Sequence, residues 1–202
     1  MSLYQFEQEQ YQKGYRWICG LDEAGRGPLA GPVFAAAVIL PRDLEIPGLN
    51  DSKKLTEKKR EALYGEIVEK AVAYGIGAAS QEEIDRVNIL NASMLAMERA
   101  FGKLQFVPDA AFVDGNRTPQ LPVPTQAVIK GDGISASIAA ASILAKVSRD
   151  RFMLEMDQRY PEYDFARHKG YPTKLHYERL RTYGPCEIHR ATFLKKVHDG
   201  KL

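Results

Sequence analysis

Short apolar runs that alternate with helical periodicity constrain the fold of this chain more than any other feature. Segments with the length and apolar content of buried strands are residues 17–21, 33–40, 74–79, 110–113 and 125–129. Apolar residues spaced by three and four predict helices at residues 56–73, 90–104, 135–160 and 173–183. Strands interleaved with helices in this way are typical of an α/β domain, with a mixed central β-sheet flanked by helices.

Length and composition argue against membrane and secreted classes of protein. The longest uninterrupted apolar run, residues 33–40, is too short for the roughly 20 residues that a bilayer-spanning helix needs. The polar N-terminus lacks the apolar core of a secretory signal, and Cys19 and Cys186 suggest neither a disulfide framework nor a metal site. We therefore expect the 202 residues to form one domain in the reducing cytoplasm.

Charge is distributed unevenly along the chain. Residues 1–145 carry 15 Lys and Arg against 18 Asp and Glu, whereas residues 146–202 carry 13 against 8 and hold all four histidines. A basic C-terminal part on a mildly acidic body indicates a polyanionic partner on one face. A solvated helical surface would have the same composition, so charge alone leaves both interpretations open.

Three predicted strands stop at acidic residues, namely Asp22-Glu23, Asp114 and Asp132. Because core strands end at the rim of a sheet, these carboxylates could gather at one edge, where like charges repel unless a cation neutralises them. Oxygen ligands without histidine or cysteine suit Mg²⁺ or Mn²⁺, and two such ions support in-line phosphoryl transfer. Each later aspartate taken singly also fits a turn, but the adjacent pair Asp22-Glu23 is costly at a core boundary without a partner.

The glycine-rich segment after the first predicted strand has two interpretations. Residues 25–30 fit the G-x-G-x-x-A pattern of dinucleotide-binding loops, yet an apolar strand at residues 33–40 follows where that pattern requires a helix. Glycines also let the backbone approach a ligand closely, and Arg26 between Gly25 and Gly27 could grip a phosphate. Beside a metal cluster, such a loop would hold a sugar-phosphate backbone.

Taken together, the motifs along the chain resemble those of ribonuclease HII, the bacterial type 2 ribonuclease H. The resemblance covers about residues 17–193 and rests on many motifs in the family's order. These are residues 22–32 (DEAGRGPLAGP), 50–55 (NDSKKL), 88–89 (NI), 113–115 (VDG), 130–132 (KGD), 139–150 (AAASILAKVSRD), 168–171 (HKGY) and 189–190 (HR).

The resemblance implies an RNase H-like fold with a small C-terminal helical extension. It divides the chain into an N-terminal extension (residues 1–16), a catalytic domain (17–160) and a basic helical part (161–202) that completes the substrate groove. The implied partner is nucleic acid, with no membrane, and the implied state is a monomer. Ribonuclease HIII carries an additional N-terminal domain, and only 16 residues precede Trp17, so that relative is not expected.

The implied activity is metal-dependent hydrolysis of the RNA strand in RNA–DNA hybrids, with incision 5′ to single ribonucleotides in duplex DNA and 3′-hydroxyl and 5′-phosphate products. The implied ligands of two Mg²⁺ or Mn²⁺ ions in the substrate complex are Asp22, Glu23, Asp114 and Asp132, with Asp22 bridging both ions. The resemblance also implies that Gly25, Arg26 and Gly27 read the 2′-hydroxyl and phosphates at the RNA-to-DNA junction. Tyr171 would stack on the sugar of the following deoxynucleotide. Further candidate substrate contacts are Lys53, Asn88, Lys146 and Lys169, and for the lysines a role in surface solubility is the alternative.

The sequence offers further candidate contact residues and two alternative functions. Lys54 and Arg190 are also candidate phosphate contacts, while His168 and His189 show no metal-ligand spacing and are expected to be structural or phosphate-contacting. A non-catalytic nucleic-acid-binding module, with turn residues in place of metal ligands, is the alternative from another class. A nucleotide-dependent oxidoreductase is a third alternative, and it would bind a dinucleotide cofactor.

Overall fold

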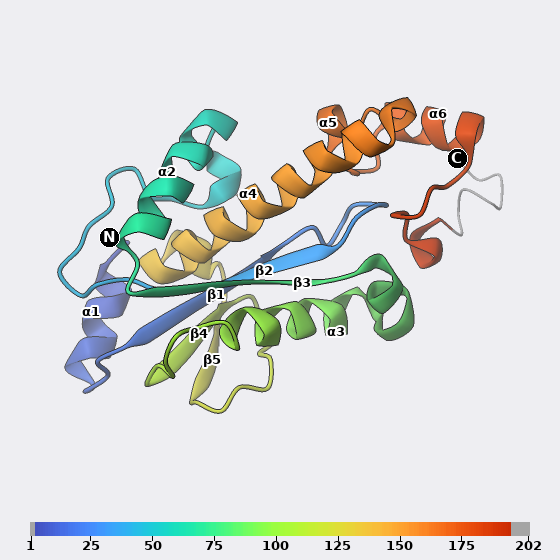
Figure 1. Cartoon of the computed structure of the whole chain (residues 1–202). Helices are drawn as coiled ribbons and strands as arrows, with labels where there is room; N and C mark the ends of the chain where they lie inside the picture. The colour runs from blue at the N-terminus through green and yellow to red at the C-terminus, as the bar shows by residue number, and fades with distance from the viewer. Residues whose placement is uncertain (1–2, 195–202) are drawn as a thin grey trace.

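A five-stranded mixed sheet forms the centre of the structure, a computed structural model that describes residues 3–194 (Figure 1). Its strands are β1 (Ile18–Ala24), β2 (Val33–Ile39), β3 (Ala73–Ala79), β4 (Ala110–Asp114) and β5 (Thr125–Val128). They lie in the order β3-β2-β1-β4-β5. The pairs β1–β2 and β2–β3 are antiparallel, and β1–β4 and β4–β5 are parallel. The predicted mixed sheet is confirmed.

The prediction that the first strand stops before Asp22 is wrong. β1 continues through Asp22 and Glu23, which pair with Ala36 and Ala35 of β2. Main-chain hydrogen bonding carries the strand past the end of the apolar run, since a strand ladder pairs backbone groups whatever the side chains are. Because side chains alternate along a strand, Asp22 and Glu23 start from opposite faces of the sheet.

Helices cover both faces of the sheet. The four predicted helices are present as α2 (Glu57–Lys70), α3 (Gln81–Phe101), α4 (Ala136–Arg159) and α6 (Lys174–Tyr183). Two more, α1 (Gln5–Gln12) and the short α5 (Phe165–His168), lie in segments without a predicted helix. The 3₁₀ turns are η1 (Ser52–Lys54), η2 (Gly131–Gly133), η3 (Pro161–Tyr163) and η4 (Ala191–Phe193). Within residues 3–194, no helix is long and apolar enough to cross a membrane.

The helix α1 is polar in sequence, and tertiary contacts hold it in place. The buried Glu7 carboxylate accepts hydrogen bonds from Ser135 Oγ at 2.5 Å and from the Ser137 N–H at 3.0 Å, at the start of α4. A carboxylate is favourable there because the first N–H groups of a helix lack intrahelical partners. The ring of Phe6 packs edge-on against Phe112 of β4. The described part of the N-terminal extension therefore packs onto the sheet domain.

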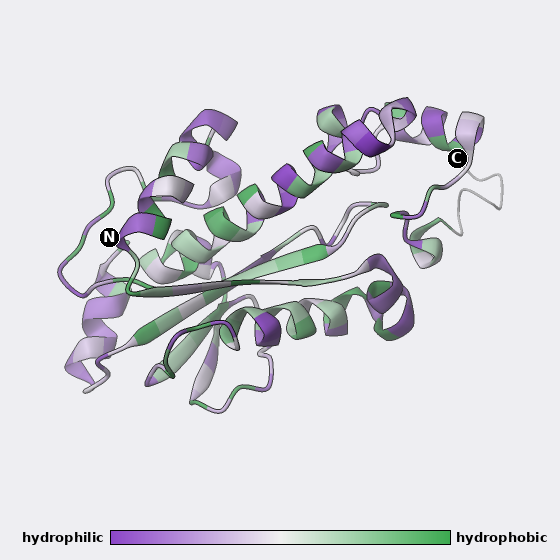
Figure 2. Cartoon of the chain, viewed as in Figure 1, coloured by the Kyte–Doolittle hydropathy of each residue, from purple (hydrophilic) through white to green (hydrophobic). Residues whose placement is uncertain are grey.

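Two apolar layers form because strand side chains alternate between the faces of the sheet. Cys19 and Leu21 of β1 pack in the layer beneath α3, whereas Ala36 and Val38 of β2 pack in the layer beneath α4. Figure 2 shows hydrophobic colouring along the strands between these two helices and mostly hydrophilic colouring on α1, α2 and α6. The small-residue start of α4 is buried against the sheet. The residue that precedes Leu21, Gly20, makes this close approach possible.

We predict that Gly20→Ala lowers the free energy of unfolding by about 3 kcal/mol, because a methyl group there meets backbone that cannot move away. A Cβ at Gly20 would lie 2.2 Å from the Ser137 carbonyl carbon and 2.3 Å from the Ile138 nitrogen. Urea denaturation measures the change. Gly65→Ala on α2 is the control, because nothing lies within 4 Å of a Cβ there, and it should stabilise by up to about 1 kcal/mol. Equal effects of the two changes would contradict this packing.

The C-terminal part forms a separate apolar cluster at the end of α4. Its buried residues include Met153, Tyr163, Phe165, Leu180 and Ile188. The segment 188–190 also joins the glycine-rich loop after β1: the Gly31 N–H donates to Ile188 at 2.8 Å, and Ala30 pairs with His189 in a β-bridge. Figure 1 shows α5 alongside the C-terminal turns of α4 and α6 beyond the end of that helix. The predicted helical extension is present, and it is fastened to the loop that precedes β2.

Candidate active site

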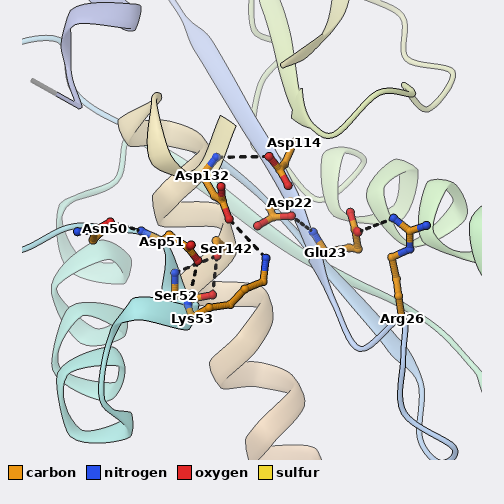
Figure 3. Close-up of polar contacts among 10 residues, drawn as sticks. All are labelled: Asp22, Glu23, Arg26, Asn50, Asp51, Ser52, Lys53, Asp114, Asp132 and Ser142. Carbon is orange, nitrogen blue, oxygen red and sulfur yellow. Dashed lines mark hydrogen bonds and ion pairs between the residues drawn. The ribbon is translucent and has the colours of Figure 1, made fainter. Parts of the chain in front are cut away.

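Three carboxylates meet on the face of the sheet that α4 covers. β1 and β4 are parallel neighbours with Leu21 opposite Val113, so Asp22 and Asp114, one residue further along each strand, lie side by side. Asp132 comes from η2, just before α4 begins. One carboxylate oxygen from each of these aspartates lies within 4.8 Å of the others. Figure 3 shows the three side chains pointing toward one another.

Without a cation, it is unfavourable for these three neighbouring carboxylates to be negatively charged at the same time. Burial raises the pKa of Asp22 well above its usual value, and the nearby charges of Glu23 and Asp114 raise it further. Burial also raises the pKa of Asp132, with Asp114 adding to the effect. A set of carboxylate oxygens at this spacing suits a hard divalent cation such as Mg²⁺ or Mn²⁺. The donor set therefore fits the predicted metal.

Glu23 lies near this cluster but has a different contact. Its Oε1 accepts a hydrogen bond from Arg26 Nη1 at 3.3 Å, as Figure 3 shows. Burial raises the pKa of Glu23, and the Arg26 guanidinium partly opposes that rise. Within residues 3–194, the group of acidic side chains close enough to share an ion contains Asp22, Asp114 and Asp132 without Glu23. Three of the four predicted metal ligands therefore lie together, and the role of Glu23 as the fourth ligand stays a prediction.

Lysine and serine side chains from η1 border the acidic cluster. Lys53 Nζ lies 3.5 Å from Asp132 Oδ2, and Ser142 Oγ of α4 donates to Ser52 Oγ at 2.6 Å (Figure 3). Burial tends to lower the pKa of Lys53, but the surrounding carboxylates, with Asp22 foremost, outweigh it and raise the pKa. A cavity lined by Lys53, Lys54 and Lys130 continues past Asp132, which extends the predicted basic surface beside the site.

The Gly-Arg-Gly loop is held from behind by a buried arginine. Arg190 donates hydrogen bonds to the carbonyl oxygens of Gly25 at 2.6 Å, Arg26 at 3.1 Å, Pro28 at 2.8 Å and Gly31 at 2.9 Å. The prediction that Arg190 contacts phosphate is wrong, because its side chain is fully buried and bonded to the loop backbone. Burial and the charge of Arg149 lower its pKa to about 9. Nothing in the sequence around Arg190 indicates that its side chain supports the glycine-rich loop.

Tyr171 stands over two cations from α4. The ring centroid lies 5.7 Å from Lys146 Nζ and 5.6 Å from the guanidinium carbon of Arg149. Its side chain is partly exposed and lines one cavity with Asp22 and Lys146. The glycine-rich loop, residues 24–27, lines the same cavity. The structure therefore brings Tyr171, Lys146 and the Gly-Arg-Gly loop beside the acidic cluster.

Sequence reasoning missed Arg149. Its side chain is fully buried, and its Nη2 donates to the Ala30 carbonyl at 3.1 Å. A Cβ at Gly25, whose φ is +100°, would lie 2.2 Å from Arg149 Nε. Gly25 is therefore required both for its left-handed backbone and for the space that the arginine fills. The helical spacing of Arg149 from Lys146, three residues, places both on the side of α4 that faces Tyr171 and could have indicated this role.

Two other predicted contacts have local structural roles. Asn88 interrupts α3 with φ 69° and ψ 163°, a conformation that costs about 1–3 kcal/mol for a residue other than glycine. Its Oδ1 accepts from the N–H groups of Leu90 at 3.0 Å and Asn91 at 3.1 Å, which starts the second part of the helix. Lys169 Nζ donates to the Ala166 carbonyl at 2.5 Å. Substrate contact by Asn88 or Lys169 stays a prediction.

The fold and this site define a hydrolase with the RNase H-like fold. The crystal structure of ribonuclease H2 from Pyrococcus horikoshii OT3 matches with a TM-score of 0.74 at 27% identity, over 92% of this chain and 98% of that one. The RNase HII in the PCNA:RNase HII complex from Archaeoglobus fulgidus matches with a TM-score of 0.68 at 26% identity, over 87% and 93% of the two chains.

The chain belongs to the ribonuclease HII family, whose model matches residues 19–196. The ribonuclease HII of Caldicellulosiruptor saccharolyticus is 55% identical over 196 residues, which cover 97% of this chain and 96% of that protein. The predicted family is therefore confirmed. The protein is an enzyme, a ribonuclease H that acts on nucleic acid.

Proposed function

We propose that this ribonuclease H hydrolyses the RNA strand of RNA–DNA hybrids and incises 5′ to single ribonucleotides in duplex DNA, leaving 3′-hydroxyl and 5′-phosphate ends. The observation that carries the proposal is the single cavity in which Asp22 and Asp114 lie beside the Gly-Arg-Gly loop and Tyr171. One end of such a cavity suits a divalent cation, and the other suits a sugar-phosphate backbone.

The reaction needs a nucleophile and a neutralised leaving group at one phosphate. When bound by Asp22, Glu23, Asp114 and Asp132, two Mg²⁺ or Mn²⁺ ions would activate water and stabilise the leaving oxygen. The chain's own residues supply the rest. Lys53 offers a positive charge beside Asp132, and the exposed Arg26 side chain can turn from Glu23 to a substrate phosphate. Because water is the nucleophile, no covalent enzyme intermediate forms.

Recognition of the junction is assigned to two elements that share the cavity. Gly27 has nothing within 4 Å of a Cβ position, so its backbone is open to close approach by a 2′-hydroxyl or a phosphate. The Tyr171 ring, partly exposed above Lys146 and Arg149, offers a flat face to the next sugar.

The two free thiols, Cys19 and Cys186, support a reducing cellular compartment for this enzyme, and we propose that it works as a monomer.

A gel assay with one duplex tests the proposal. A DNA duplex with a single embedded ribonucleotide is incubated with Mg²⁺, with Mn²⁺ and with EDTA, beside a uniform RNA–DNA hybrid and an all-DNA duplex. We expect metal-dependent incision 5′ to the ribonucleotide, cleavage of the hybrid, and an intact DNA duplex. Binding of the hybrid without cleavage at any metal concentration would instead identify a non-catalytic binding module.

We predict that Tyr171→Ala lowers kcat/KM for the single-ribonucleotide duplex by about tenfold or more relative to the uniform hybrid. The reason is the loss of the aromatic face that packs on the sugar, which we take as comparable to the lower part of the roughly 1–3 kcal/mol that an aromatic ring contributes on a base. Tyr171→Phe is the matched control, because it keeps the ring and removes only the hydroxyl. An unchanged ratio of the two kcat/KM values in Tyr171→Ala would exclude the stacking role.

A further inference from the structure

Three buried histidines pack together behind Tyr171, and the proposed reaction uses none of them. His168 ends α5, His176 lies on α6, and His189 precedes η4. The rings of His168 and His176 stack with centroids 4.3 Å apart and planes 16° from parallel. His176 Nε2 lies 3.0 Å from His189 Nε2. All three side chains are buried, and the ring of Phe165 packs against each of them.

The hydrogen-bond partners determine where each proton lies. His176 Nδ1 contacts the Tyr171 carbonyl at 3.0 Å, and since a carbonyl only accepts, this nitrogen carries the proton. The Nε2 atom of neutral His176 is then an acceptor, so His189 Nε2 must donate to it. His189 Nδ1 is consequently an acceptor, and the Cys186 N–H donates to it at 2.9 Å.

The third ring obeys the same logic. The Gly170 N–H donates to His168 Nδ1 at 3.1 Å, so His168 carries its proton on Nε2 and donates to the Tyr163 carbonyl at 2.9 Å. Every acceptor nitrogen of the three rings thus faces an N–H group. The Cys186 Sγ and carbonyl oxygen also lie 3.2 and 3.3 Å from His189 Nδ1, but the Cys186 N–H at 2.9 Å is its nearest partner. Burial agrees with neutral rings, because it lowers the pKa of His176 and His189 to about 4.

These imidazoles connect Tyr171 to the glycine-rich loop. Cys186 anchors His189, His189 donates to His176, and His176 donates to the carbonyl of Tyr171. At its other end, His189 pairs through its backbone with Ala30 in the loop. The carbonyl of Gly170, next to Tyr171, accepts from the Leu29 N–H at 2.8 Å. The ring that would stack on the substrate and the loop that would read it therefore share one buried support.

We propose that the hydrogen bond between His189 and His176 positions Tyr171 against the Gly-Arg-Gly loop and so determines the preference for an RNA-to-DNA junction. This inference rests on the proposed function, because it requires that Tyr171 contacts the substrate. His176 and His189 are positioning residues, because they act through Tyr171 and do not touch the substrate themselves. Without this bond, His176 loses the partner that fixes its ring and tautomer, so its hydrogen bond to the Tyr171 carbonyl weakens, although the Thr173 N–H still donates to that carbonyl at 2.8 Å.

Two replacements of His189 separate this role from a merely structural one. Glutamine places an amide donor near the Nε2 position and can still donate to His176, whereas asparagine places an acceptor near the Nδ1 position and can still accept from the Cys186 N–H. The measured quantity is the ratio of kcat/KM for the single-ribonucleotide duplex to kcat/KM for the uniform hybrid. Thermal unfolding of each variant confirms that it is folded at the assay temperature.

We expect His189→Gln to keep the ratio within about twofold of the wild-type chain and His189→Asn to lower it about tenfold, the worth of one buried hydrogen bond. The opposite order, or equal ratios in both variants, would overturn the inference. If His189→Asn does not fold, His176→Phe replaces it, because phenylalanine keeps a ring beside Phe165 and removes both hydrogen bonds. The same tenfold loss is expected there, and an unchanged ratio would again overturn the inference.

The failure of this inference is distinguishable from the failure of the proposed function. A wild-type chain that prefers the junction substrate, with unaltered ratios in the histidine variants, would contradict only the positioning role. A wild-type chain that cleaves neither substrate with Mg²⁺ or Mn²⁺ would contradict both.

Discussion

Asp22→Asn is expected to reduce cleavage by more than about a hundredfold and to raise the melting temperature of the metal-free protein by about 3 °C. The loss of activity follows from removing a central ligand, since even the partners of metal ligands contribute 10–100-fold. The gain in stability follows from removing one of several buried like charges, because Asp114 and Asp132 lie against Asp22. About 1 kcal/mol of relieved repulsion corresponds to this temperature shift in a domain of this size.

Differential scanning fluorimetry with and without Mn²⁺ provides a reading independent of activity. Mn²⁺ should raise the melting temperature of the wild-type protein and have little effect on Asp22→Asn. Asp150→Asn is the matched control, because Asp150 is also buried but accepts from Lys146 Nζ at 2.6 Å. That change should lower the melting temperature and leave the response to Mn²⁺ intact. Near-normal cleavage by Asp22→Asn would refute the metal assignment.

Arg190→Met is expected to lower the free energy of unfolding by about 4 kcal/mol and to reduce cleavage of every substrate. Methionine fills much of the same space, so the main loss is the donors to four carbonyl oxygens of the glycine-rich loop. Unsatisfied buried acceptors cost about 1–3 kcal/mol each, and water that enters the loop recovers part of that cost. Without the guanidinium, the loop would no longer hold one conformation beside the acidic cluster.

Urea denaturation and the hybrid-cleavage assay together measure this effect. Arg159→Met is the control, because Arg159 pairs with Glu187 at 2.9 Å on the surface and such pairs contribute about 0–1 kcal/mol. Similar losses of stability in the two variants would show that the buried hydrogen bonds of Arg190 contribute no more to the free energy of unfolding than a surface ion pair does. Full activity in a destabilised Arg190→Met protein would show that the loop keeps its shape without them.

The sequence predicts which acidic residues form the site, but it does not predict how their side chains are arranged. Asp22, Asp114 and Asp132 follow apolar runs that the sequence marks as core strands, and this predicts that they meet. The prediction that β1 stops at Asp22 was wrong, because a strand is also extended by pairing with its neighbour. The position of Glu23 could not be predicted, since it depends on the alternation within β1 and on a contact with Arg26.

The buried contacts that support the site could not be predicted from the sequence. Arg190 looked like one of several basic residues on a nucleic-acid surface, yet it is buried against the loop that follows β1. Sequence patterns report local periodicity, whereas these contacts join segments more than 150 residues apart. The same reason explains the unpredicted α1, whose Glu7 finds its partners at the start of α4.

The sequence by itself determined the family, the order of the five strands and of four of the helices, and the acidic residues available to a metal, because motifs and periodicity are properties of neighbouring residues. Only the tertiary structure decided which carboxylates share one cluster and which basic residues are buried. It also decided that His189 contacts His176, which contacts the Tyr171 carbonyl, and that Arg190 bonds the glycine-rich loop. The physical reason is that strand register and the burial of polar groups are set by partners distant in the chain, and their free energy exists only once those partners meet.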